Sequence, residues 1–209
     1  MDIKIPYTPR KHQAYLHRQI DNHRWNVLVC HRRFGKTVCM INHLIRSALL
    51  SKLNNPRFAY IAPTFKQAKS IAWDYMKQFT AKIPHTKFNE TELRVDLPNG
   101  SRITLLGSES PDGLRGIYLD GCVIDEYANV NSKLFPEIIR PALSDRKGYC
   151  VFIGTPMGMN NNFYELYQHA QGAEDWFNYK AKASDTKIVD NDELVKAKEV
   201  MGEKKYNQE

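Results

Sequence analysis

The chain has 209 residues, 42% of them hydrophobic and 25% charged, with a formal net charge of +7 and a pI of about 9.2. These values are ordinary for a globular protein with a sizeable core, and the excess of positive charge is compatible with a polyanionic partner. The sequence excludes a membrane-spanning helix, because no apolar run approaches the ~18 residues needed, and its N-terminus lacks the long apolar region of a secretory signal.

The cysteines lie in or beside apolar segments and have no metal-ligand spacing. They are Cys30, Cys39, Cys122 and Cys150. We interpret them as reduced thiols in the core of a cytosolic protein.

The first predicted elements are a helix, a strand and a second helix. Thr8 and Pro9 have the pattern of an N-cap and a first helical residue, so a helix is expected to run to about Asn22. Residues 25–29 form an apolar run that predicts a strand, and residues 36–50 predict a helix with one apolar face.

The loop between this strand and helix reads CHRRFGKT over residues 30–37. Strand, loop and helix in this order, with Gly-Lys-Thr at the helix start, are typical of a P-loop, whose backbone N–H groups and helix dipole bind phosphate. Lys36 would reach the β- and γ-phosphates and the Thr37 hydroxyl would bind Mg²⁺. The match is incomplete, since Cys30 replaces the usual first glycine, and an ordinary basic turn is the alternative.

The middle of the chain predicts a strand, a helix and a hairpin. Residues 57–62 form a strand ended by Pro63, and Thr64 with Gln67 forms a capping-box pattern that starts a helix to about Phe79. Residues 92–97 and 101–106 alternate around a Pro-Asn-Gly turn, which predicts a β-hairpin.

A second motif follows at residues 119–126, where an apolar strand ends in Asp125 and Glu126. Ligands of parallel α/β sheets bind at the carboxyl ends of the strands, so two adjacent acids there indicate a site, although a solvent-exposed strand end is a common alternative for this motif alone. Asp125 would hold Mg²⁺ through water, and Glu126 would polarise the attacking water. The two motifs together predict an ATP-hydrolysing site.

The remaining elements continue the alternation of strands and helices. We expect helices at residues 132–143, interrupted near Pro136 and Pro141, at 162–171 and at 192–201, and strands at 149–153 and 176–181. The alternation predicts a mainly parallel sheet with helices on both faces.

Three weaker signals stand beside the two motifs. Thr155 follows the strand at 149–153, where its hydroxyl could touch the γ-phosphate region, although a strand-ending turn is the simpler interpretation. Gln13 could pair with adenine and Tyr7 could stack on it, unless Gln13 is a surface residue. Arg115, in a loop with glycines on both sides, could stabilise transition-state charge, although a solvated arginine is the default.

The ordered set of these motifs resembles a known family. Gln13, RRFGKT, a hairpin, GLRG at 113–116, VIDE at 123–126 and IGTP at 153–156 occur in the order found in the ATPase domain of phage large terminase subunits. The resemblance runs from about Tyr7 to the end of the chain. It implies an α/β P-loop NTPase fold of the RecA-like (ASCE) class, with a mainly parallel central sheet flanked by helices and a β-hairpin insertion.

The resemblance also implies roles for individual residues. Lys36 and Thr37 would belong to the Walker A motif, Asp125 to Walker B, Glu126 would be the catalytic glutamate, and Thr155 the coupling residue. Arg32 or Arg33 would be the P-loop arginine, and Arg115 an arginine finger acting on a neighbouring subunit. The expected catalytic residues are Glu126, Arg115 and Lys36, and the metal ligands Thr37 and Asp125. The expected nucleotide-binding residues are Tyr7, Gln13, Arg32, Arg33, Phe34, Gly35, Lys36, Thr37 and Thr155.

The same resemblance implies a motor that hydrolyses ATP with Mg²⁺ and drives double-stranded DNA into the procapsid. Its partners would be DNA, the portal protein and the small terminase subunit, and it would act in the host cytoplasm. We expect a homo-oligomeric ring on the portal, a monomer when isolated, and no membrane association.

We expect residues 1–209 to form a single ATPase domain without the family's nuclease domain, and therefore no nuclease activity. Two alternatives remain open at this point. A helicase-like translocase of superfamily 2 also uses an upstream Gln, Gly-Lys-Thr and Asp-Glu, but it needs a second RecA-like lobe. A non-catalytic nucleic-acid-binding module would not need intact Lys36, Thr37, Asp125 and Glu126.

Overall fold

The computed structural model describes residues 4–190 together with residues 192, 196 and 199. One mixed sheet forms its centre, with the strand order β3-β4-β5-β2-β6-β7-β1-β8. The strands are β1 Trp25–Cys30, β2 Arg57–Ala62, β3 Lys87–Asn89, β4 Arg94–Asp96, β5 Arg102–Gly107, β6 Gly121–Ile124, β7 Tyr149–Gly154 and β8 Trp176–Ala181.

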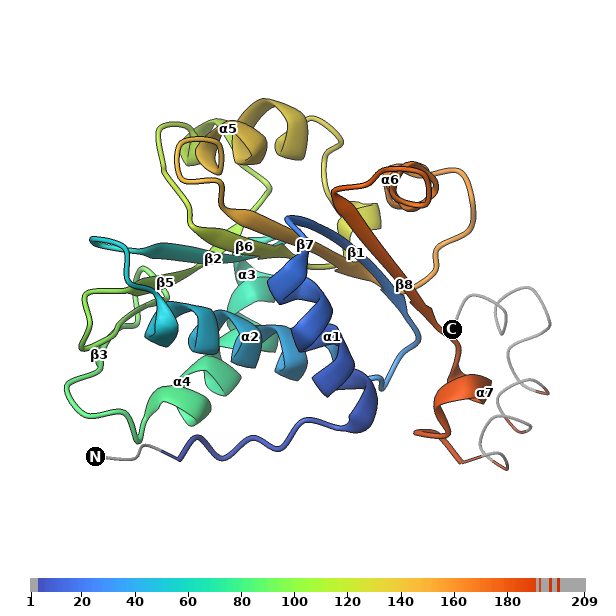
Figure 1. Cartoon of the computed structure of the whole chain (residues 1–209), viewed down its shortest axis with the longest axis horizontal. Helices are drawn as coiled ribbons and strands as arrows, with labels where there is room; N and C mark the ends of the chain where they lie inside the picture. The colour runs from blue at the N-terminus through green and yellow to red at the C-terminus, as the bar shows by residue number, and fades with distance from the viewer. Residues whose placement is uncertain (1–3, 191, 193–195, 197–198, 200–209) are drawn as a thin grey trace.

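Helices cover both faces of this sheet, as predicted. Figure 1 shows α1, α2 and α4 on one face and α5 and α6 on the other. The helices are α1 Lys11–Asn22, α2 Lys36–Leu50, α3 Phe65–Ala68, α4 Asp74–Thr80, α5 Arg140–Ala142, α6 Asn162–Ala170 and α7 Ala183–Thr186. π-Helical segments at Lys69–Trp73 and Phe135–Ile139 precede α4 and α5, and short 3₁₀ turns occur at Pro111–Leu114 and Tyr127–Asn129.

The strands that carry the sequence motifs are mutually parallel. β6 lies between β2 and β7, and β7 lies between β6 and β1, with all of these pairs parallel. The carboxyl ends of β1, β6 and β7 therefore meet at one edge of the sheet, where α/β proteins bind ligands. The fold that the sequence and the resemblance predicted is confirmed.

The predicted hairpin extends this sheet and does not stand apart from it. β4 and β5 pair antiparallel, and Gly100 has a left-handed φ of 81° in the turn between them. β5 also pairs parallel with β2, and a short strand that the sequence did not predict, β3, forms the edge.

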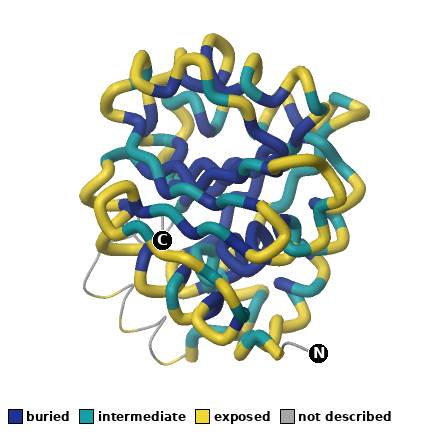
Figure 2. The backbone as a smooth tube through the Cα atoms, turned by 90° about the vertical axis from the view of Figure 1, so that its left-hand side faces the viewer, coloured by how far each residue is buried: buried dark blue, intermediate teal, exposed yellow. Residues whose placement is uncertain are grey.

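The core consists of two hydrophobic clusters, one on each face. α2 contributes Met40, Ile41 and Leu44, all fully buried, to the cluster under α1, α2 and α4, while Phe135 and Phe163 belong to the cluster on the opposite face. Figure 2 shows that the buried backbone is concentrated in the central strands. The four cysteines are buried free thiols, as predicted.

Some predicted helix boundaries were wrong. α1 begins at Lys11 and not at Pro9, because the Gln13 side chain accepts a hydrogen bond from the Arg10 N–H and Arg10 becomes the N-cap. The predicted helix at 132–143 is reduced to the segments from Phe135 to Ala142, which contain Pro136 and Pro141. The predicted helix at 192–201 lies almost entirely outside the described residues.

No helix in the part of the chain that the structure describes could span a membrane.

Candidate functional site

The P-loop wraps around the ammonium group of Lys36. Lys36 Nζ donates to the backbone oxygens of Cys30, at 3.1 Å, and His31, at 3.4 Å. Gly35, the N-cap of α2, has a φ of 86°, and a Cβ built on it would lie 2.9 Å from Gln13 Nε2. The positive φ favours glycine at this position, and a side chain there would also have to displace the Gln13 amide.

The two acidic residues emerge directly after β6. Asp125 is 4% exposed, and its Oδ1 accepts the Glu126 N–H at 2.9 Å while its Oδ2 accepts the Tyr60 hydroxyl. Burial raises the pKa of the Asp125 carboxyl to about 6. A cation bound at this carboxylate would favour the charged form and lower that pKa.

Glu126 is held by the loop that follows β7. Thr155 Oγ1 donates to Glu126 Oε1 at 3.2 Å, and the Thr155 N–H lies 3.5 Å from Oε2. The structure thus brings Thr155 to the same sheet edge as the two acids, where the sequence had placed it.

Most of these groups line one pocket of about 840 Å³, whereas the buried Asp125 is not among its lining residues. The predicted residues that line it are Arg32, Arg33, Gly35, Lys36, Thr37, Glu126 and Thr155. Sequence reasoning missed the other lining residues, which are Val38, Ile71, Tyr75, Asn129, Pro156 and Met157. Asn129 could have been predicted, because it lies only three residues after Glu126 in the sequence. Ile71 and Tyr75 belong to a helical segment far from both motifs, and no sequence pattern indicated that they line the pocket.

The donor set fits Mg²⁺ together with a nucleotide. Thr37 offers a hydroxyl and Asp125 a carboxylate, both hard oxygen ligands, and the P-loop offers its N–H groups to phosphate. Within the described residues, no three His, Cys, Asp or Glu side chains form a metal cluster. A single carboxylate is nevertheless the usual arrangement when the substrate phosphates complete the Mg²⁺ sphere.

Gln13 of α1 and the Phe34 ring within the P-loop lie on the side of the loop away from the pocket and do not line it. Gln13 is 4% exposed, its Nε2 donates to the Gly35 oxygen at 3.3 Å, and its Oε1 accepts the Arg10 N–H at 2.9 Å. The Phe34 ring is 1% exposed and packs against His31 and Tyr179. Both side chains are thus occupied in supporting the loop.

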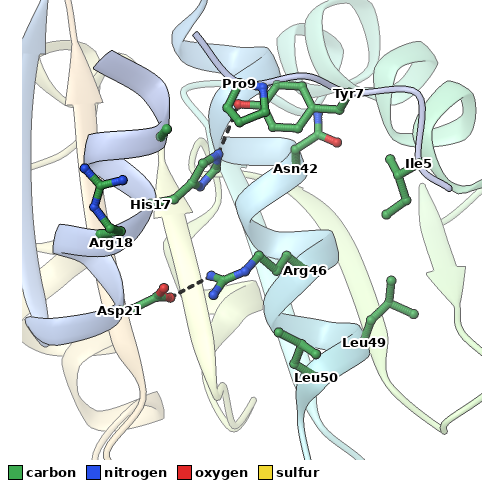
Figure 3. A pocket seen from close by; sticks show the side chains of 11 residues that line it. Ile5, Tyr7, Pro9, His17, Arg18, Asp21, Asn42, Arg46, Leu49 and Leu50 are labelled. Atoms are coloured by element: carbon green, nitrogen blue, oxygen red, sulfur yellow. Dashed lines mark hydrogen bonds and ion pairs between the residues drawn. The ribbon is translucent and has the colours of Figure 1, made fainter. Parts of the chain in front are cut away.

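Tyr7 lies in a different pocket, of about 490 Å³, between the N-terminal segment, α1 and α2. Figure 3 shows its ring beside His17 and Asn42, with the ion pair of Asp21 and Arg46 further along the same pocket. The Tyr7 hydroxyl is 3.0 Å from His17 Nε2. The structure therefore separates Tyr7 from the P-loop pocket, because the segment before α1 packs along the helices and not over the sheet edge.

Arg115 also lies away from the pocket. It follows the 3₁₀ turn Pro111–Leu114, its side chain is 56% exposed, and its Nε donates to Asp112 Oδ1 at 2.8 Å. Glu137 lies 3.9 Å from its Nη2. It does not line the pocket of its own chain.

With this geometry established, sequence comparison identifies the family. The family model described as "Terminase large subunit, T4likevirus-type, N-terminal" matches residues 29–202. The chain belongs to this terminase family. The resemblance inferred from the motifs is thereby confirmed, and the helicase-like alternative is not favoured.

Curated relatives include the terminase large subunits of Thermus phage G20c and Thermus virus P23-45. Each is 30% identical over 126 residues, covering 51% of this chain and 26% of the relative. The chain therefore spans about a quarter of the length of these terminase subunits.

Solved terminase structures share the fold. The Thermus phage P74-26 large terminase ATPase domain superposes with a TM-score of 0.81 at 21% identity, covering 98% of this chain and 93% of that one. The large terminase of a thermophilic bacteriophage, in complex with ATP-gamma-S, gives a TM-score of 0.74 at 14% identity, covering 91% of this chain and 49% of that one. At these identities the likeness establishes the P-loop NTPase fold.

Proposed function

We propose that this chain is the ATP-hydrolysing motor domain of a terminase that drives double-stranded DNA into a phage procapsid. The observation that carries the proposal is the meeting of Lys36, Thr37, Glu126 and Thr155 in one pocket, with Asp125 next to Glu126, in a member of the terminase family. The large terminase of the thermophilic bacteriophage, a fold neighbour, has been solved with ADP and with ATP-gamma-S.

Each group has a distinct task in this proposal. Lys36, already inside the loop, would exchange its bonds to backbone oxygens for bonds to the β- and γ-phosphates. Thr37 and Asp125 would hold Mg²⁺, which supplies positive charge against the phosphates. Glu126 would leave Thr155 and accept a hydrogen bond from the attacking water, making that water a better nucleophile.

Arginines would complete the charge of the site. Arg32 and Arg33 both line the pocket, and either could meet the phosphates as the P-loop arginine. We further propose that Arg115 acts on the neighbouring subunit, which is supported by its exposure and by its absence from the lining of its own pocket.

The coupling to DNA rests on the family and on charge. The net charge of +7 suits a polyanionic partner, and family membership supports double-stranded DNA, the portal protein and the small terminase subunit as partners. We propose that residues 1–209 act as one ATPase domain that forms a ring on the portal and is monomeric when isolated. The single sheet with a core cluster on each face supports the one-domain assignment.

The test is Mg²⁺-dependent ATP turnover together with nucleotide binding. Lys36→Ala should lose ATP binding, because the phosphates lose the charge inside the loop. Glu126→Gln should bind ATP and lose turnover, because an amide cannot polarise water as a carboxylate does. Glu165→Gln, the same change on the exposed surface of α6, is the matched control and should behave as wild type. Normal turnover by the Glu126→Gln protein would refute the assignment of Glu126.

A further inference from the structure

A buried tyrosine lies directly beneath the site, on a strand that carries neither motif. Tyr60 of β2 is fully buried, and it belongs to the hydrophobic cluster covered by α2, the helix that begins with the P-loop. A phenolic hydroxyl in such a cluster costs free energy unless it is hydrogen-bonded, and phenylalanine would fill the same space without that cost. The hydroxyl therefore calls for an explanation beyond packing.

The partner of this hydroxyl is Asp125, one of the two proposed metal ligands, whose Oδ2 accepts its hydrogen. Asp125 thus has one oxygen fixed by Tyr60 and the other fixed by the Glu126 N–H. Tyr60 therefore connects β2 with the end of β6 at the carboxylate itself.

The register of the sheet makes this bridge possible. β2 and β6 are parallel neighbours, with Tyr60 opposite Val123, and the Asp125 N–H donates to the Ile61 oxygen at 2.7 Å. The Tyr60 ring therefore needs to extend only about two residues along the sheet, roughly 7 Å, to reach the carboxylate. α2 lies over the same face and buries the Tyr60 ring against the sheet.

We propose that Tyr60 is a positioning residue that holds the Asp125 carboxylate in the orientation that binds magnesium–nucleotide. The inference rests on the proposed function, because it assumes that Asp125 binds the metal. Fixing this carboxylate in advance removes an ordering cost that binding would otherwise have to meet.

Tyr60→Phe tests this inference through binding and not turnover. The affinity for ADP is measured with Mg²⁺ and again with EDTA. We expect Tyr60→Phe to weaken binding in Mg²⁺ about tenfold, equivalent to about 1.4 kcal/mol, and to leave binding in EDTA unchanged. The matched control is Tyr149→Phe, which removes another hydroxyl from the same face of the sheet, one that donates to Ser47 Oγ at 3.1 Å, and should change neither affinity.

A second measurement separates positioning from packing. In an Asp125→Asn background, Tyr60→Phe should have no further effect on the Mg²⁺-dependent affinity, because the group that it orients is gone. Equal losses with Mg²⁺ and with EDTA, or an undiminished effect in that background, would show that the hydroxyl serves only the core and would overturn the inference. If the wild-type protein binds ADP and Tyr60→Phe binds it equally well, this inference alone is overturned. If the wild-type protein binds no nucleotide, the proposed function is overturned as well.

Discussion

At the scale of single residues, Glu126 stands out for its backbone. Its φ of 45° and ψ of 50° lie in the left-handed region, which non-glycine residues seldom adopt. Such strain persists where the surrounding structure compensates for it, and it concentrates at functional sites. Here the conformation places the carboxylate against Thr155, at the junction of the loops after β6 and β7.

Thr155 therefore links the proposed catalytic carboxylate to the end of β7. If the Thr155 hydroxyl senses the state of the site through its bond to Glu126, Thr155→Ala should reduce DNA packaging by the full-length protein much more than ATP hydrolysis. Both rates are measured on the same preparation, and Thr155→Ser, which keeps the hydroxyl, should restore packaging. Equal losses of hydrolysis and packaging would place Thr155 in the chemical step.

At the scale of elements, α1 serves as a support for the P-loop. Gln13 uses both ends of its amide, one for the Arg10 N–H and one for the Gly35 oxygen, and the Arg10 guanidinium lies 3.4 Å from the Phe34 oxygen. The loop that would bind phosphate is thus fixed from behind by one turn of helix.

Gln13→Ala should weaken ATP and GTP binding by the same factor, about fivefold for the loss of about 1 kcal/mol of hydrogen bonding. The reason is that the amide holds the loop and is not available to a base. Parallel titrations with the two nucleotides measure the factor, and Gln168→Ala on the exposed side of α6 is the control. A selective loss of ATP affinity would instead show that Gln13 reads adenine.

α1 and α2 are joined by a stacked pair of histidines, of which His43 is buried and His17 is half-buried. The rings of His17 and His43 stack at 5.3 Å, with their Nδ1 atoms 3.0 Å apart. Burial lowers the pKa of His17 to about 4 and, together with the neighbouring His17, lowers that of His43 to about 3. Both side chains are therefore neutral in the folded protein near pH 7.

This pair predicts a loss of stability in acid. In the unfolded chain these histidines bind protons below their ordinary pKa of 6.5, whereas His17 in the folded protein stays neutral down to about pH 4. The free energy of unfolding is therefore greatest above pH 6.5 and decreases as the pH falls below it. His17 alone accounts for up to roughly 3 kcal/mol of this loss. The free energy of unfolding, measured in urea between pH 7 and 4.5, should depend less on pH in His43→Gln than in the wild-type protein. An unchanged slope in His43→Gln would contradict the assignment.

At the scale of the whole molecule, the pocket faces outward at one edge of the sheet while Arg115 lies on a separate exposed turn. If Arg115 acts on a neighbour, an isolated subunit lacks a charge that contributes about 10³–10⁵ in rate in other phosphoryl-transfer enzymes. ATP turnover per subunit should then rise with protein concentration or on the portal, and Arg115→Ala should abolish that rise without affecting ATP binding.

Mixing two inactive variants tests the same arrangement. Arg115→Ala subunits retain Glu126, and Glu126→Gln subunits retain Arg115, so mixed rings should recover part of the turnover. Mixtures that recover none, together with turnover that is independent of concentration, would show that Arg115 does not act between subunits.

The sequence by itself determined the elements that have strong local signals. The P-loop strand and α2, the Thr64 capping box, the hairpin turn at Gly100 and the Asp-Glu at the end of β6 were all predictable, because periodicity, glycine and capping act over a few residues. The sequence also predicted that Lys36, Thr37, Asp125, Glu126 and Thr155 lie at one edge of the sheet. Each of these residues follows a parallel strand, and the carboxyl ends of parallel strands lie at the same edge.

Only the tertiary structure decided which nearby side chains join that site. Tyr7 and Gln13 are close to the P-loop in sequence, yet one lies in another pocket and the other is used to hold Gly35. Tyr60 and Tyr75 carried no motif, and they reach the site because strand register and the packing of α2 and α4 bring them there. Such contacts depend on the pairing of distant segments, which local sequence patterns do not encode.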